Sequence, residues 1–256
     1  MKVVHSAQEL PSGCAFVPTM GALHAGHGSL FSLARESSDS VIASIFINPL
    51  QFENQEDLLR YPKTPESDIE LAQSSGVTHL WFPKYDEIYP EGFQTLKAGA
   101  IGDLFEGASR PGHFDGVVTV VNRLFQLVKP VSAVFGEKDF QQLRLVEAMA
   151  ADVKIIRGPI VRESDGLAMS SRNVRLSPEG RAASSIIYKA LSTAKSESEL
   201  QEILKSQPLL ELDYATFIDE ETFLPSGDKS KNVRAIVAGW INGVRLLDNM
   251  HMEISA

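Results

Sequence analysis

The sequence predicts an α/β protein: a parallel sheet with helices on both faces, followed by a smaller C-terminal α+β domain. Apolar strands and amphipathic helices alternate over the first two-thirds of the chain, as in consecutive βαβ units. Residues 41–47 (VIASIFI) form a continuous β-branched and apolar run, which is typical of a strand buried on both faces. This alternation ends near residue 160. We therefore expect two domains, 1–160 and 161–256.

The first domain opens with a short strand over 15–17 that is expected to end at Pro18, followed by a helical face over 28–37. Thr64 and Pro65 suit the start of a helix that Gly76 ends, because Thr caps helix N-termini and Pro fits the first turn. The other elements expected in this domain are strands over 77–82, 133–135 and 154–156 and helices over 116–128 and 141–151.

The second domain begins with a polar loop over 161–173. Ser177 and Pro178 then open a helix that is expected to run to about 195. A second helix over 199–205 and strands over 214–218 and 233–238 complete the expected elements.

Composition limits the class of protein. With 43% hydrophobic and 22% charged residues, the 256-residue chain is not intrinsically disordered, and its net charge of −9 argues against nucleic-acid partners. No apolar run approaches the roughly 18 residues that cross a membrane. The one cysteine, Cys14, excludes a disulfide framework and is expected to be a buried, inert thiol. A cytoplasmic protein fits these observations.

Parallel sheets bind ligands outside the carboxyl ends of their strands, so the loops after residues 17, 47 and 135 are the candidate sites. His24 and His27 lie in the first of these loops (PTMGALHAGH), where a helix N-terminus favours anions. Two imidazoles three residues apart can donate hydrogen bonds to phosphate oxygens. They could also ligate a metal, or simply cap and pack the helix.

The two other loops carry further polar groups. Gln51 follows the buried strand and offers both a donor and an acceptor to a hydroxyl or carboxylate. Lys138 is a mobile charge suited to phosphate, and Gln142 lies one helical turn beyond it. Asp139 suits a ribose hydroxyl or, equally, a helix N-cap.

A fourth polar cluster, Ser170, Ser171 and Arg172, combines two hydroxyls with a planar guanidinium, which suits a phosphate clamp. The alternative is an ordinary linker between domains. Residues 101–180 are electrically neutral, whereas the rest of the chain carries the whole negative charge. If the protein binds an anion, this middle block is where the site is expected. The alternative is that the acidic surface only aids solubility. The histidines His5, His79 and His251 are expected to be structural or solvated, and the sequence leaves the roles of Arg110 and His113 open.

Six stretches in order, VPTMGALHAGH, SIFINPLQF, YPKTPESD, EGASRPGHF, FGEKDFQQL and VRESDGLAMSSRN, resemble the pantothenate synthetase (pantoate–β-alanine ligase) family. The resemblance spans nearly the whole chain. Any one of these motifs would be weak evidence for the family, but six motifs in the same order are highly specific. The HxGH motif with a later Ser/Arg loop is also similar to the wider superfamily of HxGH nucleotidyltransferases. The resemblance implies a Rossmann-like N-terminal domain that binds nucleotide and pantoate, and a C-terminal lid domain.

The family's reaction joins pantoate to β-alanine through a pantoyl adenylate, with ATP consumed to AMP and pyrophosphate. The resemblance implies Mg²⁺, a homodimer, and His27 as the catalytic proton donor with His24 and Lys138 beside it. It implies that Gln51 and Gln142 bind pantoate and that Gln51 also borders β-alanine. The ATP-binding residues that it implies are Met20, Gly21, Ala22, Leu23, His24, Ala25, Gly26, His27, Gly136, Glu137, Lys138, Asp139, Val161, Met169, Ser170, Ser171 and Arg172.

The protein ligands of the metal stay unassigned: Asp68 is a candidate, but its neighbour Ser67 is not a ligand of the expected type. Two other functions remain open at this point. One is an adenylyltransferase with a different acceptor; only Gln51 and Gln142 favour pantoate over another acceptor. The other is a nucleotide-binding protein without catalytic activity, although the histidines, Lys138 and the Ser-Ser-Arg loop are all present.

Overall fold

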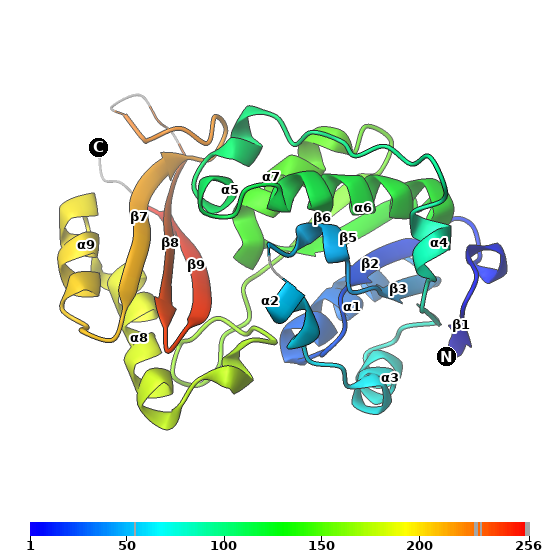
Figure 1. Ribbon diagram of the computed structural model, residues 1–256, viewed down its shortest axis with the longest axis horizontal. Helices are drawn as coiled ribbons and strands as arrows, with labels where there is room; N and C mark the ends of the chain where they lie inside the picture. The colour runs from blue at the N-terminus through cyan, green and yellow to red at the C-terminus, as the bar shows by residue number, and fades with distance from the viewer. Residues whose placement is uncertain (54, 228–229, 231, 254–256) are drawn as a thin grey trace. The chain divides into compact units, whose positions relative to one another are not determined.

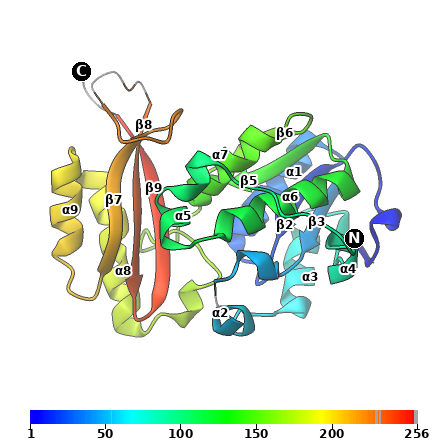
Figure 2. The same ribbon diagram turned by 45° about the horizontal axis from the view of Figure 1, so that its top comes forward.

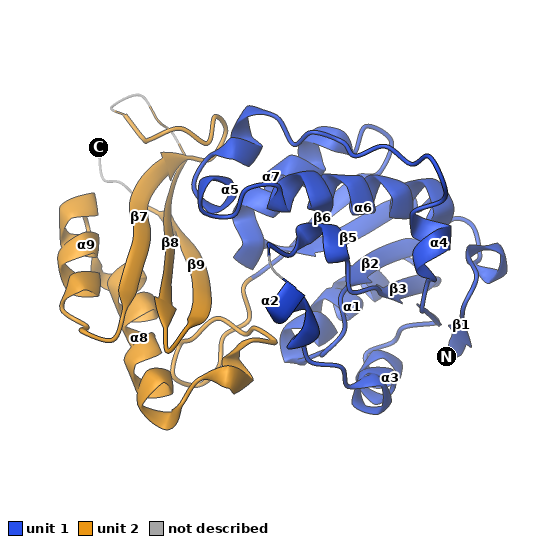
Figure 3. Cartoon of the chain, in the orientation of Figure 1, with its two compact units in different colours: residues 1–159 blue, residues 160–256 orange. Residues whose placement is uncertain are grey.

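The computed structural model describes residues 1–53, 55–227, 230 and 232–253. The chain forms two compact units, Met1–Pro159 and Ile160–Ala256 (Figure 3).

Unit 1 is built on a parallel sheet with the strand order β1-β4-β3-β2-β5-β6 (Figure 1). Chain order reverses between neighbouring β2 and β5, where Ala15 pairs with Ser132. Such a reversal is the topological switch point at which α/β sheets bind ligands. The strands are β1 (Lys2–Val4), β2 (Ala15–Thr19), β3 (Val41–Ile45), β4 (His79–Trp81), β5 (Ser132–Gly136) and β6 (Lys154–Gly158).

Both faces of this sheet are covered. Val17 of β2 packs in one buried cluster with Phe31 of α1, while the ring of its neighbour Phe16 lies 6.5 Å from that of Phe125 on α6. Successive strand residues point to opposite faces, so both must be apolar, as the continuous apolar runs predict. The helices of unit 1 are α1 (Ala25–Ser37), α2 (Gln55–Leu59), α3 (Pro65–Ser74), α4 (Tyr85–Ile88), α5 (Glu106–Ser109), α6 (His113–Val128) and α7 (Phe140–Met149).

The expected end of β2 at Pro18 is wrong, because the strand continues to Thr19. Pro18 pairs with Ser44 of β3, but β2 is paired with β5 only at Ala15 and Phe16. Proline has no backbone N–H to donate, but no hydrogen bond to β5 is lost, because β5 does not pair with β2 at this position. Short 3₁₀ turns follow β3 and β5: η2 (Pro49–Gln51) and η4 (Glu137–Asp139).

Unit 2 is a three-stranded antiparallel sheet in the order β7-β8-β9, with α8 against β8 and β9 and α9 against β7 (Figure 2). Its core includes Ile187, Leu191, Leu200 and Leu204 of the two helices. The sequence did not predict the last strand. The elements are α8 (Pro178–Thr193), α9 (Glu197–Lys205), β7 (Glu211–Asp219), β8 (Val233–Ile241) and β9 (Val244–Met252).

The structure confirms an α/β fold with a smaller α+β part. Cys14 is buried, and burial raises the pKa of its thiol to about 11, as expected of an inert side chain. Within the described part of the chain, every helix is too short or too polar to cross a membrane.

Candidate active site

The loop after β2 brings His24 and His27 together at the start of α1, with ring centroids 4.1 Å apart. His24 is the N-cap, and its Nδ1 accepts the Gly26 N–H at 3.2 Å. His27 Nδ1 in turn accepts the His24 N–H at 3.2 Å. A neutral imidazole whose Nδ1 accepts carries its proton on Nε2. Both histidines therefore cap the helix through Nδ1 and keep Nε2–H as their donor.

Electrostatics keep His27 neutral. Burial lowers its pKa to about 3, and the neighbouring His24 and Lys138 act in the same direction, against the opposing effect of Asp139. At neutral pH, His27 is thus an uncharged hydrogen-bond donor. The influence of Lys138 and Asp139 also means that the loops after β2 and β5 lie close together at the switch point.

Asp68 of α3 anchors the loop after β2. Its Oδ2 accepts the Ala22 N–H at 3.0 Å, and its Oδ1 accepts the Leu23 N–H at 2.7 Å and the Thr64 hydroxyl at 3.0 Å. At Gly21 φ is +83°, and a Cβ there would lie 3.0 Å from Asp68 Oδ2, so this turn requires glycine.

The candidate role of Asp68 as a metal ligand does not fit this arrangement. Its carboxylate is 2% exposed and already accepts three hydrogen bonds. Among the residues that the structure describes, no three His, Cys, Asp or Glu side chains are grouped so that they could hold a metal ion. Mg²⁺ is a hard cation that can instead keep most of its waters and bind through substrate phosphates.

In the loop after β5, Lys138 Nζ lies 3.5 Å from Asp139 Oδ1. Asp139 occupies the N-cap position of α7, but its side chain makes no capping hydrogen bond there. The N-cap alternative raised by the sequence is therefore not the role of this carboxylate.

Two neighbouring glutamines of α7 differ in role. Gln141 is buried; its Oε1 accepts the Glu106 N–H at 3.1 Å, and its Nε2 donates to the Ile101 and Leu104 carbonyls, both at 2.7 Å. Gln141 thus supports the loop that precedes α5. Gln142 is only partly buried and remains the candidate for substrate binding.

Gln51 lies at the end of η2, after β3. Its Oε1 accepts from Asn48 Nδ2 at 3.1 Å, and its Nε2 lies 3.0 Å from Met20 Sδ. The buried Asn48 is held by the Tyr89 hydroxyl, which donates to its Oδ1 at 2.7 Å. The loops after β2 and β3 therefore meet through the Gln51 side chain.

Sequence reasoning left Arg110 and His113 without a role and did not consider Glu106. Arg110 and His113 contact the carbonyl oxygen of Gln51, and Glu106 pairs with Arg110 at 3.1 Å. The EGASRPGHF stretch was the available signal, but nothing in the sequence indicates which backbone it contacts.

In unit 2, residues 161–173 form an ordered loop. Met169 N–H donates to the Val161 carbonyl at 3.0 Å, and Arg172 N–H to Ser170 Oγ at 3.3 Å. Asn173 Nδ2 ties the loop to Glu163 Oε1 at 3.0 Å, and Arg181 holds Glu163 through two hydrogen bonds of 2.9 and 2.7 Å. Ser170, Ser171 and Arg172 are partly buried.

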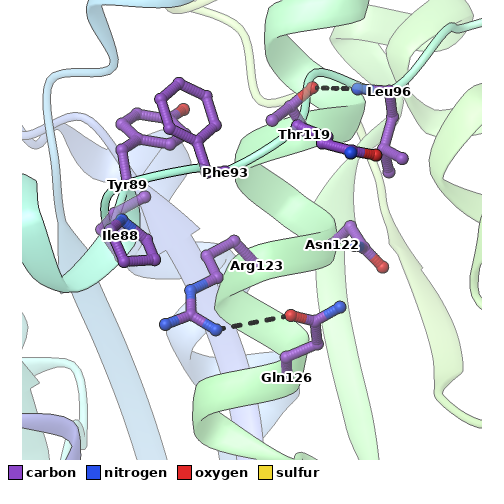
Figure 4. A pocket seen from close by; sticks show the side chains of 10 residues that line it. Ile88, Tyr89, Phe93, Leu96, Thr119, Asn122, Arg123 and Gln126 are labelled. Carbon is purple, nitrogen blue, oxygen red and sulfur yellow. Dashed lines mark hydrogen bonds between the residues drawn. The ribbon is translucent and has the colours of Figure 1, made fainter.

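A pocket of about 230 Å³ lies between the segment after α4 and helix α6 in unit 1 (Figure 4). Tyr89, Phe93, Asn122, Arg123 and Gln126 are among the residues that line it. None of the residues that the sequence singled out for binding or catalysis belongs to its lining. The candidate active site is therefore the edge of the sheet, not this pocket.

Unit 1 defines an α/β protein of the class that binds a nucleotide at the switch point of a parallel sheet, with a histidine pair at the first helix N-terminus. A family model described as pantoate-beta-alanine ligase matches residues 1–251. The chain therefore belongs to the pantoate–beta-alanine ligase family, and the resemblance carried by the six motifs is confirmed.

Individual relatives agree. The chain is 46% identical to a pantothenate synthetase of Chlorobium chlorochromatii, over 93% of this chain and 89% of that protein. A crystal structure of pantothenate synthetase from Thermus thermophilus superposes with a TM-score of 0.92 at 44% identity, over 98% of this chain and 99% of that one. A pantoate-beta-alanine ligase from Francisella tularensis, solved in complex with beta-gamma ATP and beta-alanine, gives a TM-score of 0.83 at 35% identity, over 98% and 97%.

Proposed function

We propose that the chain catalyses the ATP-dependent condensation of D-pantoate with β-alanine to pantothenate. In the first step a pantoate carboxylate oxygen forms a bond to the α-phosphorus of ATP, and pyrophosphate leaves. In the second step the β-alanine amine attacks the acyl carbon of pantoyl adenylate, loses a proton, and AMP leaves. The observation that carries the proposal is the histidine pair at the switch point, with Lys138 close to it.

The first step is an in-line displacement at phosphorus, in which positioning and charge stabilisation supply most of the catalysis. His27 contributes the proton-bearing Nε2 as a hydrogen-bond donor to the phosphate oxygens, with His24 beside it. The low pKa of His27 favours this neutral donor over an imidazolium in the enzyme without ATP. Lys138 stabilises the negative charge that develops on the departing pyrophosphate.

The remaining residues bind the substrates. The turn from Met20 to His27 follows the triphosphate, while Gly136, Glu137 and Asp139 hold adenosine and the backbone of Val161 contacts adenine. Met169, Ser170, Ser171 and Arg172 bind the triphosphate, for which a guanidinium and two hydroxyls are suited. Gln51 and Gln142 orient pantoate, and Gln51 also borders β-alanine.

Mg²⁺ bound to the triphosphate would supply charge neutralisation during displacement. We assign no protein ligand to it, since the carboxylate of Asp68 is committed to backbone amides. We also propose a homodimer working in the cytoplasm, with the division between a substrate-binding domain and a lid domain near residue 160. Light scattering at micromolar concentration tests the dimer.

Pyrophosphate release from ATP and Mg²⁺ with D-pantoate, with and without β-alanine, tests the reaction. We expect release that depends on pantoate, and pantothenate only after β-alanine is added. Release with other hydroxy acids but not with pantoate would favour an adenylyltransferase with another acceptor. ATP binding without release on any acid would favour a non-catalytic nucleotide-binding protein.

A further inference from the structure

The carbonyl oxygen of Gln51 is held by two cationic or polar side chains from a separate part of unit 1. His113 Nδ1 lies 2.8 Å from it and Arg110 Nη2 lies 3.1 Å from it. A carbonyl can only accept, so His113 carries its proton on Nδ1 and donates from there. This is the opposite tautomer from that of His24 and His27.

The two donors are themselves fixed. Arg110 Nη1 donates to Glu106 Oε1 at 3.1 Å and lies 3.3 Å from His113 Nε2, the acceptor nitrogen of that tautomer. Glu106 and His113 are 4% and 8% exposed. A largely buried ion pair contributes little net stability but is sensitive to geometry, so it specifies where the guanidinium lies.

The main chain of η2 also lies directly against α6. A Cβ built on Gly116 would be 2.4 Å from the Leu50 carbonyl oxygen and 2.9 Å from the Gln51 nitrogen. Asn48 Nδ2 donates to the Gly116 carbonyl at 3.1 Å and also to Gln51 Oε1. Gln51 is thus fixed at its carbonyl by Arg110 and His113 and at its side chain by Asn48.

We propose that Arg110 and His113 are positioning residues that hold the Gln51 backbone so that its side-chain amide meets pantoate. They act through Gln51 and not by touching the substrate. The inference rests on the proposed role of Gln51 in pantoate binding. A misplacement of about 1 Å in a substrate-orienting group is enough to weaken productive binding substantially.

Steady-state kinetics with pantoate varied at saturating ATP and β-alanine test this inference. His113→Ala removes one donor and is expected to raise the pantoate KM about three- to tenfold, with the ATP KM unchanged. His113→Asn carries an amide N–H near the position of Nδ1–H and is expected to restore most of the loss. In a Gln51→Ala background, His113→Ala is expected to add no further increase, because the residue through which it acts is gone.

Leu124→Ala is the matched control. It removes a buried side chain from the same helix, three turns beyond His113, and is expected to lower the melting temperature without changing the pantoate KM. Arg110→Lys keeps a positive charge for Glu106 but loses the planar fork. It tests the same contact should His113→Ala fail to fold, with an expected increase in pantoate KM of about threefold.

The variants distinguish the substrate-binding role of Gln51 from the positioning role of Arg110 and His113. A parental pantoate KM in Gln51→Ala would overturn the proposed role of Gln51 itself. A raised KM in Gln51→Ala with a parental KM in His113→Ala and Arg110→Lys would overturn only the inference. An increase by His113→Ala that is as large in the Gln51→Ala background as in the parent would overturn it as well.

Discussion

In unit 1, His24, His27 and His113 contact a loop backbone through Nδ1, and the kind of backbone group contacted determines which ring nitrogen carries the proton. His24 and His27 accept backbone N–H groups through Nδ1, which leaves the proton on Nε2. His113 donates from Nδ1 to a carbonyl and turns an acceptor toward Arg110. The same residue type therefore keeps an Nε2–H donor, which we propose faces the substrate, in one loop, and holds a backbone carbonyl in another.

The donor role of His27 predicts which replacements keep activity. His27→Ala should lower kcat by about 10²–10³-fold, as is typical when one donor to developing charge is removed. His27→Gln, which can place an N–H near the Nε2 position, should retain more activity than His27→Asn. Initial rates of pyrophosphate release measure this, and Lys138→Ala should show a comparable loss. A near-parental rate in His27→Ala would remove it from the mechanism.

Asp68 offers a second prediction at this scale. Asp68→Asn keeps one carbonyl oxygen for the N–H groups of Ala22 and Leu23, so a buried donor loses its acceptor and unfolding free energy should fall by about 1–3 kcal/mol. Urea denaturation measures the loss. Glu70→Gln, an exposed change of the same charge in the middle of the same helix, should leave stability nearly unchanged. A selective increase in the Mg²⁺ concentration needed for activity would instead make Asp68 a metal ligand.

At the scale of the elements, the position of η2 depends on Gly116 of α6, because only a residue without a side chain leaves room for the η2 backbone there. Gly116→Ala should push η2 away, because the new Cβ would overlap the Leu50 carbonyl. We expect a loss of about 1–3 kcal/mol in unfolding free energy and a higher pantoate KM. Gly227→Ala is the control, since a Cβ there meets no atom within 4 Å. Unchanged stability and pantoate KM in Gly116→Ala would mean that η2 tolerates the displacement.

Some elements could be read from the sequence and others could not. Long apolar runs and capped helices were predictable because local propensity and burial agree in them. β9 was missed although Asn242 and Gly243, with φ of 51° and 70°, form the two-residue turn that joins β8 to β9, and Asn-Gly is a strong hairpin signal. The contacts of Arg110 and His113 with Gln51 had no such signal, because they join segments about 60 residues apart.

For the whole molecule, the strand alternation predicts the sheet, and the rule for ligand binding in such sheets selects the candidate edge from the sequence alone. The strand pattern and the binding rule do not predict the substrate, because Gln51 and Gln142 alone do not identify an acid. The prediction of pantoate came from the six ordered motifs. The kinetic variants test the proposed positions of the site residues relative to the substrates.

Two neutral histidines also make the stability of the folded chain depend on pH. Burial lowers the pKa of His27 to about 3 and that of His113 to about 4, below the ordinary value of 6.5. At pH values between the lowered pKa of each histidine and 6.5, that histidine binds a proton in the unfolded chain but not in the folded chain. Unfolding free energy should therefore fall as pH drops below about 6.5, by at most about 1.4 kcal/mol per pH unit for each histidine.

Urea denaturation at pH 7, 6 and 5 measures this slope, without ATP because bound phosphates would raise the pKa of His27. The double variant His27→Gln/His113→Asn should show a shallower slope over the same interval. A parental stability that is constant from pH 7 to pH 5 would contradict the neutral state of both rings.

The reversal of strand order between β2 and β5 also affects how the protein is made. Ala15 must wait for Ser132 before the two strands can pair, and translation at about 5–20 residues per second makes that wait on the order of ten seconds. Throughout this interval, the edge of β2 that later pairs with β5 stays unpaired on the ribosome-bound chain. The nascent N-terminal segment therefore exposes an unpaired strand edge of the kind that chaperones protect from aggregation.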